Sequence, residues 1–374
     1  MRSSSARLLA RHGRRALAGG CALALALGAA ACGGSDDDSS SGSATTGASG
    51  SGGGGALPSR PIEGRPVPAR RADEKTRIAM VGFANNPYWV SVKQGVDTAN
   101  SVLKGYNGQV DWIVAGDKID VPTVNAALNA ASSQGYDGVG FFIAGDGNCP
   151  TIRALTAKGM AVGAYNTLFD CVESSGGVID YAQEQYQAGV DSARQLIDAV
   201  GDRGGKVGII VSQFSAPGSE QRRKGFLEGL RGSSITPIGD GVEAVDSAGR
   251  TFNAAKDYIT ANPDLVGIYA TAGGPFGAAQ AVAAARKQDQ VKVIGYDFTP
   301  ENVKAIRDGS MYGVTGQDEF GQGYNVAMAL FNKVVADERQ DRVLQPAAAP
   351  FMTRANVDSL DPAKLPIGTV PEAK

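Results

Sequence analysis

The fold is decided by the stretch Phe83-Ala84-Asn85-Asn86-Pro87-Tyr88-Trp89, which follows the apolar run 78–82 and precedes an amphipathic segment. This change of pattern predicts a strand that leads into a helix. Pro87 suits the first helical position, where its missing N–H costs nothing, and Asn86 suits the N-cap. Tyr88 and Trp89 then stand in the first helical turn, just past the carboxyl end of a strand, where ligands bind in open parallel sheets.

Aromatic rings beside amide groups suit a sugar, because a sugar ring offers C–H faces for stacking and hydroxyls around its edge. In the competing interpretation, Tyr88 and Trp89 are core residues and Asn86 is a plain cap. The heptad alone leaves both interpretations open, so the rest of the chain has to separate them.

The composition limits the partners of the chain. Its 374 residues include 36 basic and 38 acidic ones, and five of the basic residues are arginines within the first 31 positions, which hold no acidic residue. Without that segment the balance is 31 basic against 38 acidic residues, which disfavours nucleic acid and anionic lipid as partners. The only histidine, His12, lies in the same segment, so removal of the segment excludes catalytic and metal sites that need histidine. We therefore expect no metal, no cofactor and no enzymatic activity.

Residues 1–31 have the layout of an export signal, with an arginine-bearing start followed by the small, apolar and uncharged residues 16–31. The segment ends in Ala29-Ala30-Ala31-Cys32-Gly33, which resembles the bacterial lipobox, although Ala29 stands where leucine is usual. We expect cleavage before Cys32 and attachment of a lipid to it, with plain secretion as the alternative. Arg14-Arg15 leaves the twin-arginine route open beside the general secretory route.

Residues 32–75 are rich in Gly, Ser and Pro and offer almost nothing to bury. Low-complexity sequence of this kind cannot offset its ordering entropy, so we predict a disordered tether. A lipid at Cys32 would hold the protein at the outer face of the cell membrane without fixing its position.

Beyond residue 75, apolar strand-like runs alternate with helix-like stretches. The first series has strands at 78–82, 110–115, 138–143 and 161–165 and helices at 88–103, 122–133 and 150–159. The second has strands at 206–211, 265–271 and 291–296 and helices at 219–232, 251–260 and 277–287. The alternation predicts an α/β fold with two doubly wound, parallel-sheet lobes.

Five motifs of the body, in this order, resemble those of the periplasmic sugar-binding proteins of the ribose-binding type, the type I solute-binding proteins of ABC transporters. They are Asn85-Asn86-Pro87-Tyr88-Trp89, Val162-Gly163-Ala164-Tyr165-Asn166-Thr167, Gly218-Ser219-Glu220-Gln221-Arg222-Arg223-Lys224-Gly225-Phe226, Val293-Ile294-Gly295-Tyr296-Asp297 and Gly316-Gln317-Asp318. The resemblance implies two lobes that close on a sugar and are joined by three crossing strands. It assigns 76–183 and 318–348 to the N-terminal lobe, 184–317 and 349–360 to the C-terminal lobe, and 361–374 to a tail.

The same motifs imply a set of ligand-binding residues: Asn86, Tyr88, Trp89, Asn166, Arg222, Tyr296, Asp297 and Gln317. Two of these have simpler alternatives, because Arg222 could belong to a solvated helix face and Asp297 could be a capping residue. The sequence departs from the family at Thr167, where arginine is frequent. It departs again at Thr271-Ala272, where Asn-Asp is common. Asp246 is a candidate to supply the missing polar contact.

The resemblance also implies the function: an exported, lipid-anchored or periplasmic monomer that captures a small sugar or polyol and delivers it to the permease of an ABC transporter. A sensor that presents a sugar-like signal molecule to a membrane receptor is the alternative. Of the four cysteines, Cys149 and Cys171 remain in the body. Relatives with a similar pair imply a disulfide in the exported protein, and two free thiols are the alternative.

Overall fold

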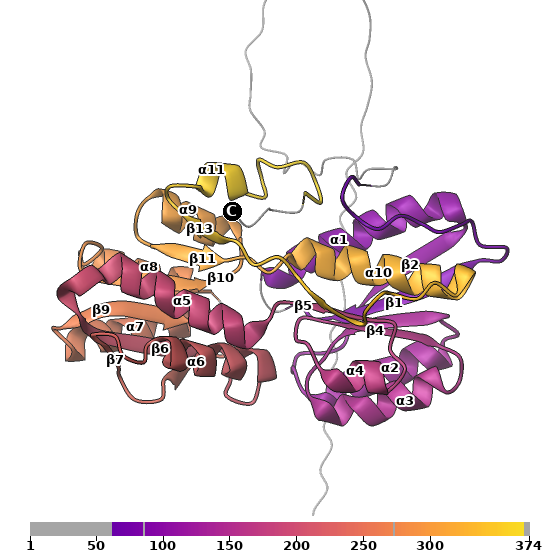
Figure 1. Ribbon diagram of the computed structural model, residues 1–374, viewed down its shortest axis with the longest axis horizontal. Coiled ribbons are helices and arrows are strands. Elements are labelled where there is room, and N and C mark those ends of the chain that lie inside the picture. Colours follow the sequence, from indigo (N-terminus) through magenta and orange to yellow (C-terminus); the bar gives the residue numbers. More distant parts are fainter. Residues whose placement is uncertain (1–61, 85–86, 272–273, 370–374) are drawn as a thin grey trace, which may run out of the picture. The chain divides into compact units, whose positions relative to one another are not determined.

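Two sheets carry the fold (Figure 1). The computed structural model describes residues 62–84, 87–271 and 274–369. One sheet has the strand order β12-β5-β4-β3-β1-β2, and the other has the order β13-β11-β10-β9-β6-β7 with β8 beside β6. The prediction of two doubly wound α/β lobes is confirmed.

The N-terminal sheet is parallel throughout. Its strands are β1 (Thr76–Gly82), β2 (Gly108–Val114), β3 (Gly138–Phe142), β4 (Ala161–Tyr165), β5 (Ile179–Ala182) and β12 (Leu344–Pro346). One face is covered by α1 (Tyr88–Leu103) and α10 (Glu319–Ala336), and the other by α2 (Val121–Ser133), α3 (Cys149–Thr156) and α4 (Asp170–Ser174) (Figure 1). Burial on both faces explains why the central strands are continuous apolar runs in the sequence.

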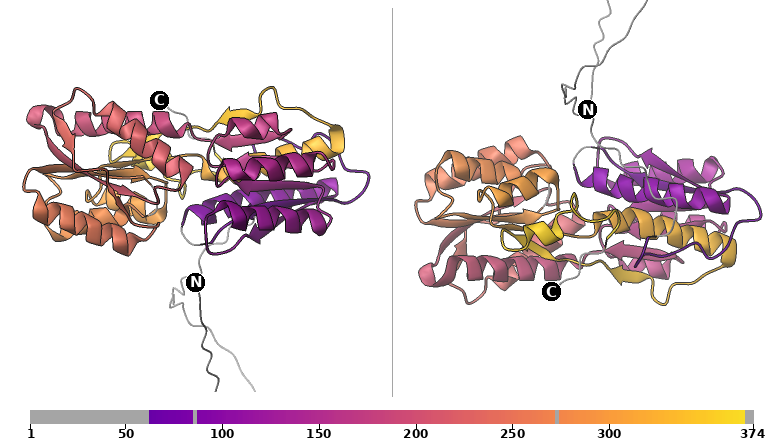
Figure 2. Two further views of the ribbon diagram at one scale, coloured as in Figure 1. Left: turned by 90° about the horizontal axis from the view of Figure 1, so that it is seen from below. Right: turned by 90° about the horizontal axis from the view of Figure 1, so that it is seen from above.

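The C-terminal sheet is parallel except for its last strand, which runs antiparallel to β11. Its strands are β6 (Gly205–Val211), β7 (Ile235–Pro237), β8 (Val242–Glu243), β9 (Leu265–Ala270), β10 (Lys292–Tyr296), β11 (Gly313–Thr315) and β13 (Phe351–Thr353). Its helices are α5 (Gln185–Val200), α6 (Pro217–Gly229), α7 (Ala248–Ala261), α8 (Phe276–Ala284), α9 (Pro300–Arg307) and α11 (Val357–Leu360). Helices α5 and α6 pack against each other, as do α7 and α8, and Figure 2 shows helices on both sides of the sheet.

The chain passes between the two sheets three times, at residues 183–184, 316–318 and 347–350. These crossings are hydrogen-bonded to one another. The side-chain amide of Gln183 donates to the Gly316 carbonyl at 2.9 Å, and the Gly316 N–H donates to the Pro350 carbonyl at 2.9 Å. The crossings therefore form one connected bundle of backbone between the lobes.

Glycines let the helix pairs approach closely in each lobe. A Cβ at Gly323 of α10 would lie 2.1 Å from the Val92 carbonyl oxygen of α1, and a Cβ at Gly225 of α6 would lie 1.9 Å from the Tyr186 carbonyl oxygen of α5. A Cβ would clash with the carbonyl oxygen at both positions, so only glycine allows the helices to approach this closely. The second approach brings α6 close enough to α5 for its Arg222 side chain to reach the first crossing.

Residues 62–75 lie on the body, so the predicted tether is wrong for this part. Arg65 forms a buried ion pair with Asp318 at 2.5 Å, and its Nε donates to the Gly368 carbonyl at 2.8 Å. The Ala69 N–H donates to the Asn332 side chain at 2.9 Å. A buried ion pair and backbone hydrogen bonds offset the ordering entropy, and the composition of the segment carries no sign of these partners. Residues 361–369 of the predicted tail pack here as well.

The predicted export signal, Cys32 and the predicted tether up to residue 61 lie outside the described residues. Among the helices that the structure does describe, none has the length and apolar character that a membrane crossing requires.

Candidate ligand-binding site

Strands of both sheets end beside one small cavity, which we call the interlobe cavity. Strands β1 and β4 of the N-terminal sheet and β6, β10 and β11 of the C-terminal sheet lead into it. Six of the eight predicted ligand-binding residues are among those that line it: Tyr88, Trp89, Asn166, Arg222, Asp297 and Gln317. The carboxyl ends of parallel strands therefore bring residues far apart in the sequence to one place, as this fold class does for its ligands.

Trp89 forms the aromatic wall of the cavity. Its ring lies 4.8 Å from the Tyr88 ring, 5.3 Å from Phe83 and 5.5 Å from Phe142, measured between centroids. Only 3% of Trp89 is exposed, and its indole N–H has no acceptor among the described residues. The wall is thus apolar, and the indole N–H is a buried donor without an acceptor among the described residues.

Asn166 and Tyr88 belong to a hydrogen-bonded chain on the N-terminal side of the cavity. The Asn166 side-chain amide donates to the Tyr88 hydroxyl at 2.9 Å, and that hydroxyl donates to Gln322 at 2.5 Å. Burial raises the pKa of Tyr88 well above its usual value, so the hydroxyl stays neutral. Asn166 has a left-handed backbone, with φ of 82°, a conformation that Asn tolerates better than most residues.

Arg222 is a buried cation held by neutral oxygens. Its guanidinium donates to Gln185 at 2.5 Å, to Gln317 at 2.9 Å, to Gln183 at 3.1 Å and to the Thr271 carbonyl at 2.9 Å. Only 4% of the residue is exposed. The alternative of a solvated helix face is therefore wrong for Arg222.

The neighbours of Arg222 on α6 do form ion pairs at the surface. Arg223 and Lys224 both pair with Glu220, at 2.8 and 3.5 Å. Because successive residues of a helix point in different directions, Arg222 points into the cavity while Arg223 and Lys224 point toward the surface.

Asp297 follows β10 and is connected to Arg222 through Gln317. The Gln317 amide accepts from Arg222 and donates to the Asp297 carboxylate at 2.5 Å. Burial raises the pKa of Asp297, and the Arg222 charge opposes that rise. The backbone of Asp297 is left-handed, with φ of 75°, and its side chain lines the cavity.

Asp246 is a second carboxyl group in the lining, supplied by the loop before α7. One of its oxygens is buried without a hydrogen-bond partner in the part of the chain that the structure describes. Burial raises its pKa, and a hydrogen bond from Ser212 opposes that rise.

The cavity has room for a small molecule only. Its volume is about 70 Å³, which is space for about five water molecules at roughly 10–15 Å³ each. A larger hollow of about 1040 Å³ lies beside Met160 and Ala161, where β4 begins. That hollow is at the wrong end of the strands for a ligand site in a parallel sheet, so we place the site in the interlobe cavity.

Sequence comparison supports the fold. A family model described as periplasmic binding protein domain matches residues 78–338. The chain belongs to this family.

Similar proteins share most of the length of this periplasmic binding protein. The D-allose-binding periplasmic protein of Escherichia coli K12 is 27% identical over 241 residues, which are 63% of this chain and 76% of that protein. The ribose import binding protein of the same organism is 24% identical over 68% of this chain and 84% of its own length. A solved ABC transporter solute-binding protein from Bacillus halodurans C-125, with bound myo-inositol, matches with a TM-score of 0.69 at 16% identity over 78% of this chain and 99% of that chain. The structural match shows the type I periplasmic binding protein fold.

Two predicted ligand residues of this periplasmic binding protein are not found in the lining. Asn86 lies outside the described residues. Tyr296 is fully buried under Arg222, whose guanidinium carbon is 3.8 Å from the ring centroid, and its hydroxyl lies 2.9 Å from the Tyr269 hydroxyl. The expectation that Tyr296 contacts the ligand is therefore corrected, because alternation along the strand turns it away from the cavity.

Several residues that line the cavity were not predicted from the sequence, among them Phe142, Ser212 and Gln185. Phe142 ends β3, Ser212 follows β6, and Gln185 begins α5. Each of these residues lies at a strand end or beside a crossing, where ligands bind in this fold class, and that position could have identified them. Thr271 stands where the family commonly has Asn, and it is buried, with its carbonyl bonded to Arg222.

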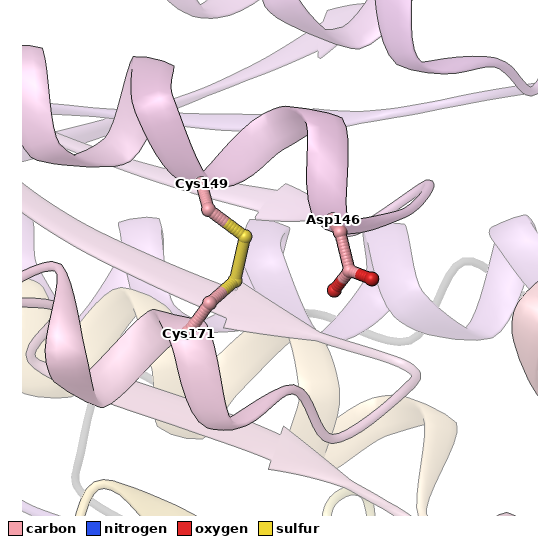
Figure 3. A group of neighbouring side chains, drawn as sticks. All are labelled: Asp146, Cys149 and Cys171. Carbon is pink, nitrogen blue, oxygen red and sulfur yellow. A yellow bond between two sulfur atoms is a disulfide. The ribbon is translucent and has the colours of Figure 1, made fainter.

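The predicted disulfide is confirmed: Cys149 is bonded to Cys171, with Cα atoms 5.8 Å apart (Figure 3). Asp146 lies near the two sulfur atoms, and these three form the only cluster of potential metal ligands found among the described residues. Because the sulfur atoms are bonded to each other, they do not act as thiolate ligands.

Proposed function

We propose that this protein captures a small sugar or polyol in the interlobe cavity and delivers it to the permease of an ABC transporter. The observation that carries the proposal is Arg222, a buried cation that lines a cavity shared with Asp297 and Trp89 and has no carboxylate partner within residues 62–84, 87–271 and 274–369. Charged groups form strong hydrogen bonds to hydroxyls, and an indole stacks on the C–H face of a sugar ring.

The polarity of the cavity supports a ring with several hydroxyls. Donors come from Arg222 and the Trp89 indole, and acceptors come from Asp246 and Asp297. A hydroxyl both donates and accepts, so a polyol can satisfy all of these groups at once. The names of the relatives, which bind D-allose, ribose and myo-inositol, agree with this ligand class.

Delivery requires that the cavity opens and closes. We propose that the three crossings at 183–184, 316–318 and 347–350 are the hinges, because only there does the backbone pass between the two sheets. Rotation about these residues would separate the N-terminal wall at Trp89 from the C-terminal wall at Arg222. The proposal assigns no chemistry to the protein, in agreement with relatives that are named as binding proteins.

A thermal-shift screen of monosaccharides and cyclic polyols on the exported protein tests the ligand class. A ligand at 100 times its dissociation constant is expected to add about 2.7 kcal/mol to the free energy of unfolding. Asp297→Ala is expected to weaken binding of that ligand about 30- to 150-fold, since the ligand hydroxyls lose a charged acceptor. Asp289→Ala, an exposed aspartate before β10, is the matched control. The ligand class is refuted if no sugar or polyol shifts the unfolding temperature.

We also propose that the protein is exported and anchored through a lipid on Cys32. The support is the signal-like opening segment and its Ala-Ala-Ala-Cys end. Cys32→Ser is expected to leave ligand binding unchanged. It is expected to release the protein from the membrane fraction, because the lipid, and not the folded body, attaches the protein to the membrane. Membrane association that survives this substitution would contradict the anchor and leave the ligand proposal untouched.

A further inference from the structure

Residues 361–369, which we call the strap, connect the two lobes in addition to the three crossings. The strap begins in the C-terminal lobe directly after α11, where the Asp361 carboxylate accepts a hydrogen bond from Arg307 of α9 at 2.6 Å. Toward its other end, the Gly368 carbonyl accepts a hydrogen bond from the Nε of Arg65 at 2.8 Å. The strap is therefore covalently continuous with the C-terminal lobe, and a hydrogen bond joins it to the segment that carries Arg65.

Arg65 belongs to the N-terminal lobe and is held there by a buried ion pair. Its two terminal nitrogens donate to the Asp318 carboxylate at 2.5 and 2.6 Å, and Asp318 is the N-cap of α10. The Tyr181 hydroxyl of β5 donates to the same carboxylate at 2.7 Å, and only 6% of Arg65 is exposed. The ion pair fixes the plane of the guanidinium, so the N-terminal lobe itself sets the direction of Nε toward Gly368.

Gly368 lies between two apolar side chains of the N-terminal lobe. A Cβ at this position would lie 2.6 Å from the Ile62 side chain and 2.9 Å from the Phe320 ring. Ile62 and Phe320 both pack against the N-terminal core, and the Arg65 guanidinium carbon lies 5.4 Å from the centroid of the Phe320 ring. The backbone of Gly368 is left-handed, with φ of 81°. Glycine therefore suits this position, and it allows the strap to approach Arg65 closely.

The strap lies beside a different cavity from the one proposed for the ligand. Gln317 of the second crossing lines the interlobe cavity, whereas its neighbours Gly316 and Asp318 line a second cavity of about 100 Å³. Leu365 and Ile367 of the strap line that second cavity as well. The residues of the strap, all of which the structure describes, do not line the interlobe cavity. An effect of the strap on a ligand therefore acts through the arrangement of the two lobes and not through direct contact.

The two ends of the strap move relative to each other when the lobes rotate. Arg307 and Arg65 belong to different lobes, so rotation about the crossings changes the distance between them. Turns at 361–364 and 366–369 each close with a backbone hydrogen bond, of 2.9 and 3.1 Å, and both shorten the strap. A large change in the distance between the ends therefore breaks a turn or the Arg65–Gly368 hydrogen bond. All of these bonds are formed in the arrangement in which both lobes line the interlobe cavity.

We propose that the strap holds the lobes in the closed arrangement: Arg65 binds Gly368 when the interlobe cavity is closed and releases it when the lobes separate. Contacts that form in only one arrangement stabilise that arrangement, so the strap raises the ligand affinity without touching the ligand. The inference rests on the proposed function, since it concerns closure on the same ligand. It gives residues 361–369 and Arg65 a role in closure, although no motif of the sequence includes them.

The first test measures the dissociation constant of the screened sugar by calorimetry in Gly368→Val. The valine side chain clashes with Ile62 and Phe320, which separates the strap from Arg65. Gly232→Val is the matched control, because Gly232 has a similar φ of 79° and its added Cβ meets no atom within 4 Å. The dissociation constant is expected to rise about fivefold relative to this control, which corresponds to about one hydrogen bond. Equal affinities overturn the proposal, also where Gly368→Val lowers the unfolding free energy, since the strap then serves only the fold.

The second test changes the other partner of the hydrogen bond. Arg65→Lys keeps a cation beside Asp318, but an ammonium lacks the planar fork that serves Asp318 and Gly368 at once. Binding is expected to weaken about three- to fivefold, while Arg70→Lys, at an exposed pair, leaves it unchanged. The double variant Arg65→Lys/Gly368→Val is expected to lose no more affinity than the weaker of the two single variants, because both remove the same contact. Losses that multiply in the double variant show independent effects and overturn the proposal.

The third test uses the reciprocity of coupled equilibria. If the strap strengthens sugar binding, the sugar strengthens the hold on the strap by the same factor. Amide hydrogen exchange of residues 361–369, followed by mass spectrometry, is therefore expected to slow by about fivefold when the sugar is added to the unsubstituted protein, and not in Gly368→Val. Unchanged exchange in the unsubstituted protein overturns the proposal.

The same exchange measurement separates the strap from the proposed function. Without sugar, residues 361–369 are expected to exchange faster in Arg65→Lys and in Gly368→Val than in Gly232→Val. Equal rates show that Arg65 does not hold the strap, and they overturn the inference. If no sugar binds at all, the proposed function fails, while this comparison still decides whether Arg65 holds the strap.

Discussion

Two buried arginines bond to adjacent residues of the crossing at 316–318, and their partners differ. Arg65 makes a two-pronged ion pair with the Asp318 carboxylate, with N–O distances of 2.5 and 2.6 Å, and both side chains are almost fully buried. Arg222 pairs with no carboxylate in the part of the chain that the structure describes, and it is held by Gln183, Gln185, Gln317 and a backbone carbonyl. Both cations are removed from water, but only Arg222 lines the interlobe cavity.

Arg65 therefore has a structural charge, whereas the charge of Arg222 is available to a ligand. The donors of Arg65 are directed at a fixed counterion, which makes the N-terminal segment part of the hinge. Amide oxygens satisfy the geometry of Arg222 without neutralising its charge, so the field of the cation extends into the cavity. We therefore expect removal of the Arg65 side chain to lower mainly the unfolding free energy, and removal of the Arg222 side chain to lower mainly the ligand affinity.

The largest effect is expected for Arg65→Met. Asp318 would remain buried without its counterion, and breaking a buried pair in this way costs about 3–5 kcal/mol of unfolding free energy. Urea unfolding of the exported protein measures this loss. The double variant Arg65→Met/Asp318→Asn is expected to recover part of it.

Arg70→Met is the control for Arg65→Met, because its pair with Asp73 is exposed and such pairs contribute about 0–1 kcal/mol. If Arg65→Met costs no more than Arg70→Met, residues 62–75 do not stabilise the hinge and the structural role of this arginine is wrong.

Arg222→Met is expected to affect binding before stability. The ligand loses charged hydrogen bonds, which corresponds to about 2–3 kcal/mol or about 30- to 150-fold in affinity. The unfolding free energy is expected to change by less than in Arg65→Met, because no buried carboxylate is left in contact without a partner. Calorimetry and urea unfolding of the same variant check both statements. Unchanged affinity together with a large loss of stability would reverse the assignment of the two arginines.

Asp180 of β5 is a buried carboxyl group that does not line the interlobe cavity, and no cation pairs with it among the described residues. One oxygen accepts the Phe169 N–H at 2.9 Å, the other has no partner among the described residues, and burial raises its pKa to about 8. The folded state therefore holds a proton that the unfolded state releases above about pH 4. Stability is expected to fall between about pH 4 and pH 8, by at most about 1.4 kcal/mol per pH unit.

Asp180→Asn is expected to remove this contribution to the pH dependence, which urea unfolding at pH 5, 6 and 7 measures. Burial raises the pKa of Glu319 to about 8 as well, so the comparison is made between the variant and the unsubstituted protein. Parallel curves would show that Asp180 is not protonated in the folded state.

The smallest effect is expected for Gln317→Ala. Gln317 connects Arg222 to Asp297, and its loss removes one hydrogen bond from each. We expect about 1 kcal/mol, or about fivefold in affinity, because water from the cavity replaces the amide in part. A loss as large as that of Arg222→Met would show that the amide itself contacts the ligand.

The sequence by itself determined the elements whose pattern is local. Helix Tyr88–Leu103 and strand Ala161–Tyr165 have the bounds expected from their apolar periodicity. Six of the predicted ligand-binding residues line the interlobe cavity, because the short motifs that contain them lie at strand ends or on the helix that faces it. The Cys149–Cys171 pair was expected from the two cysteines left in an exported body. Such signals are local because secondary structure repeats every two or 3.6 residues.

Tertiary structure alone decided which polar groups meet. Arg65 and Asp318 are separated by 253 positions, and nothing in the composition of residues 62–75 indicates their ion pair. Strands β11, β12 and β13 have three residues each, too few for a periodic signal, and depend on their neighbours in the sheets. Tyr296 and Asp297 are adjacent, yet one lies under Arg222 and the other lines the cavity. Burial and partner choice depend on the packing of distant segments, which no local pattern records.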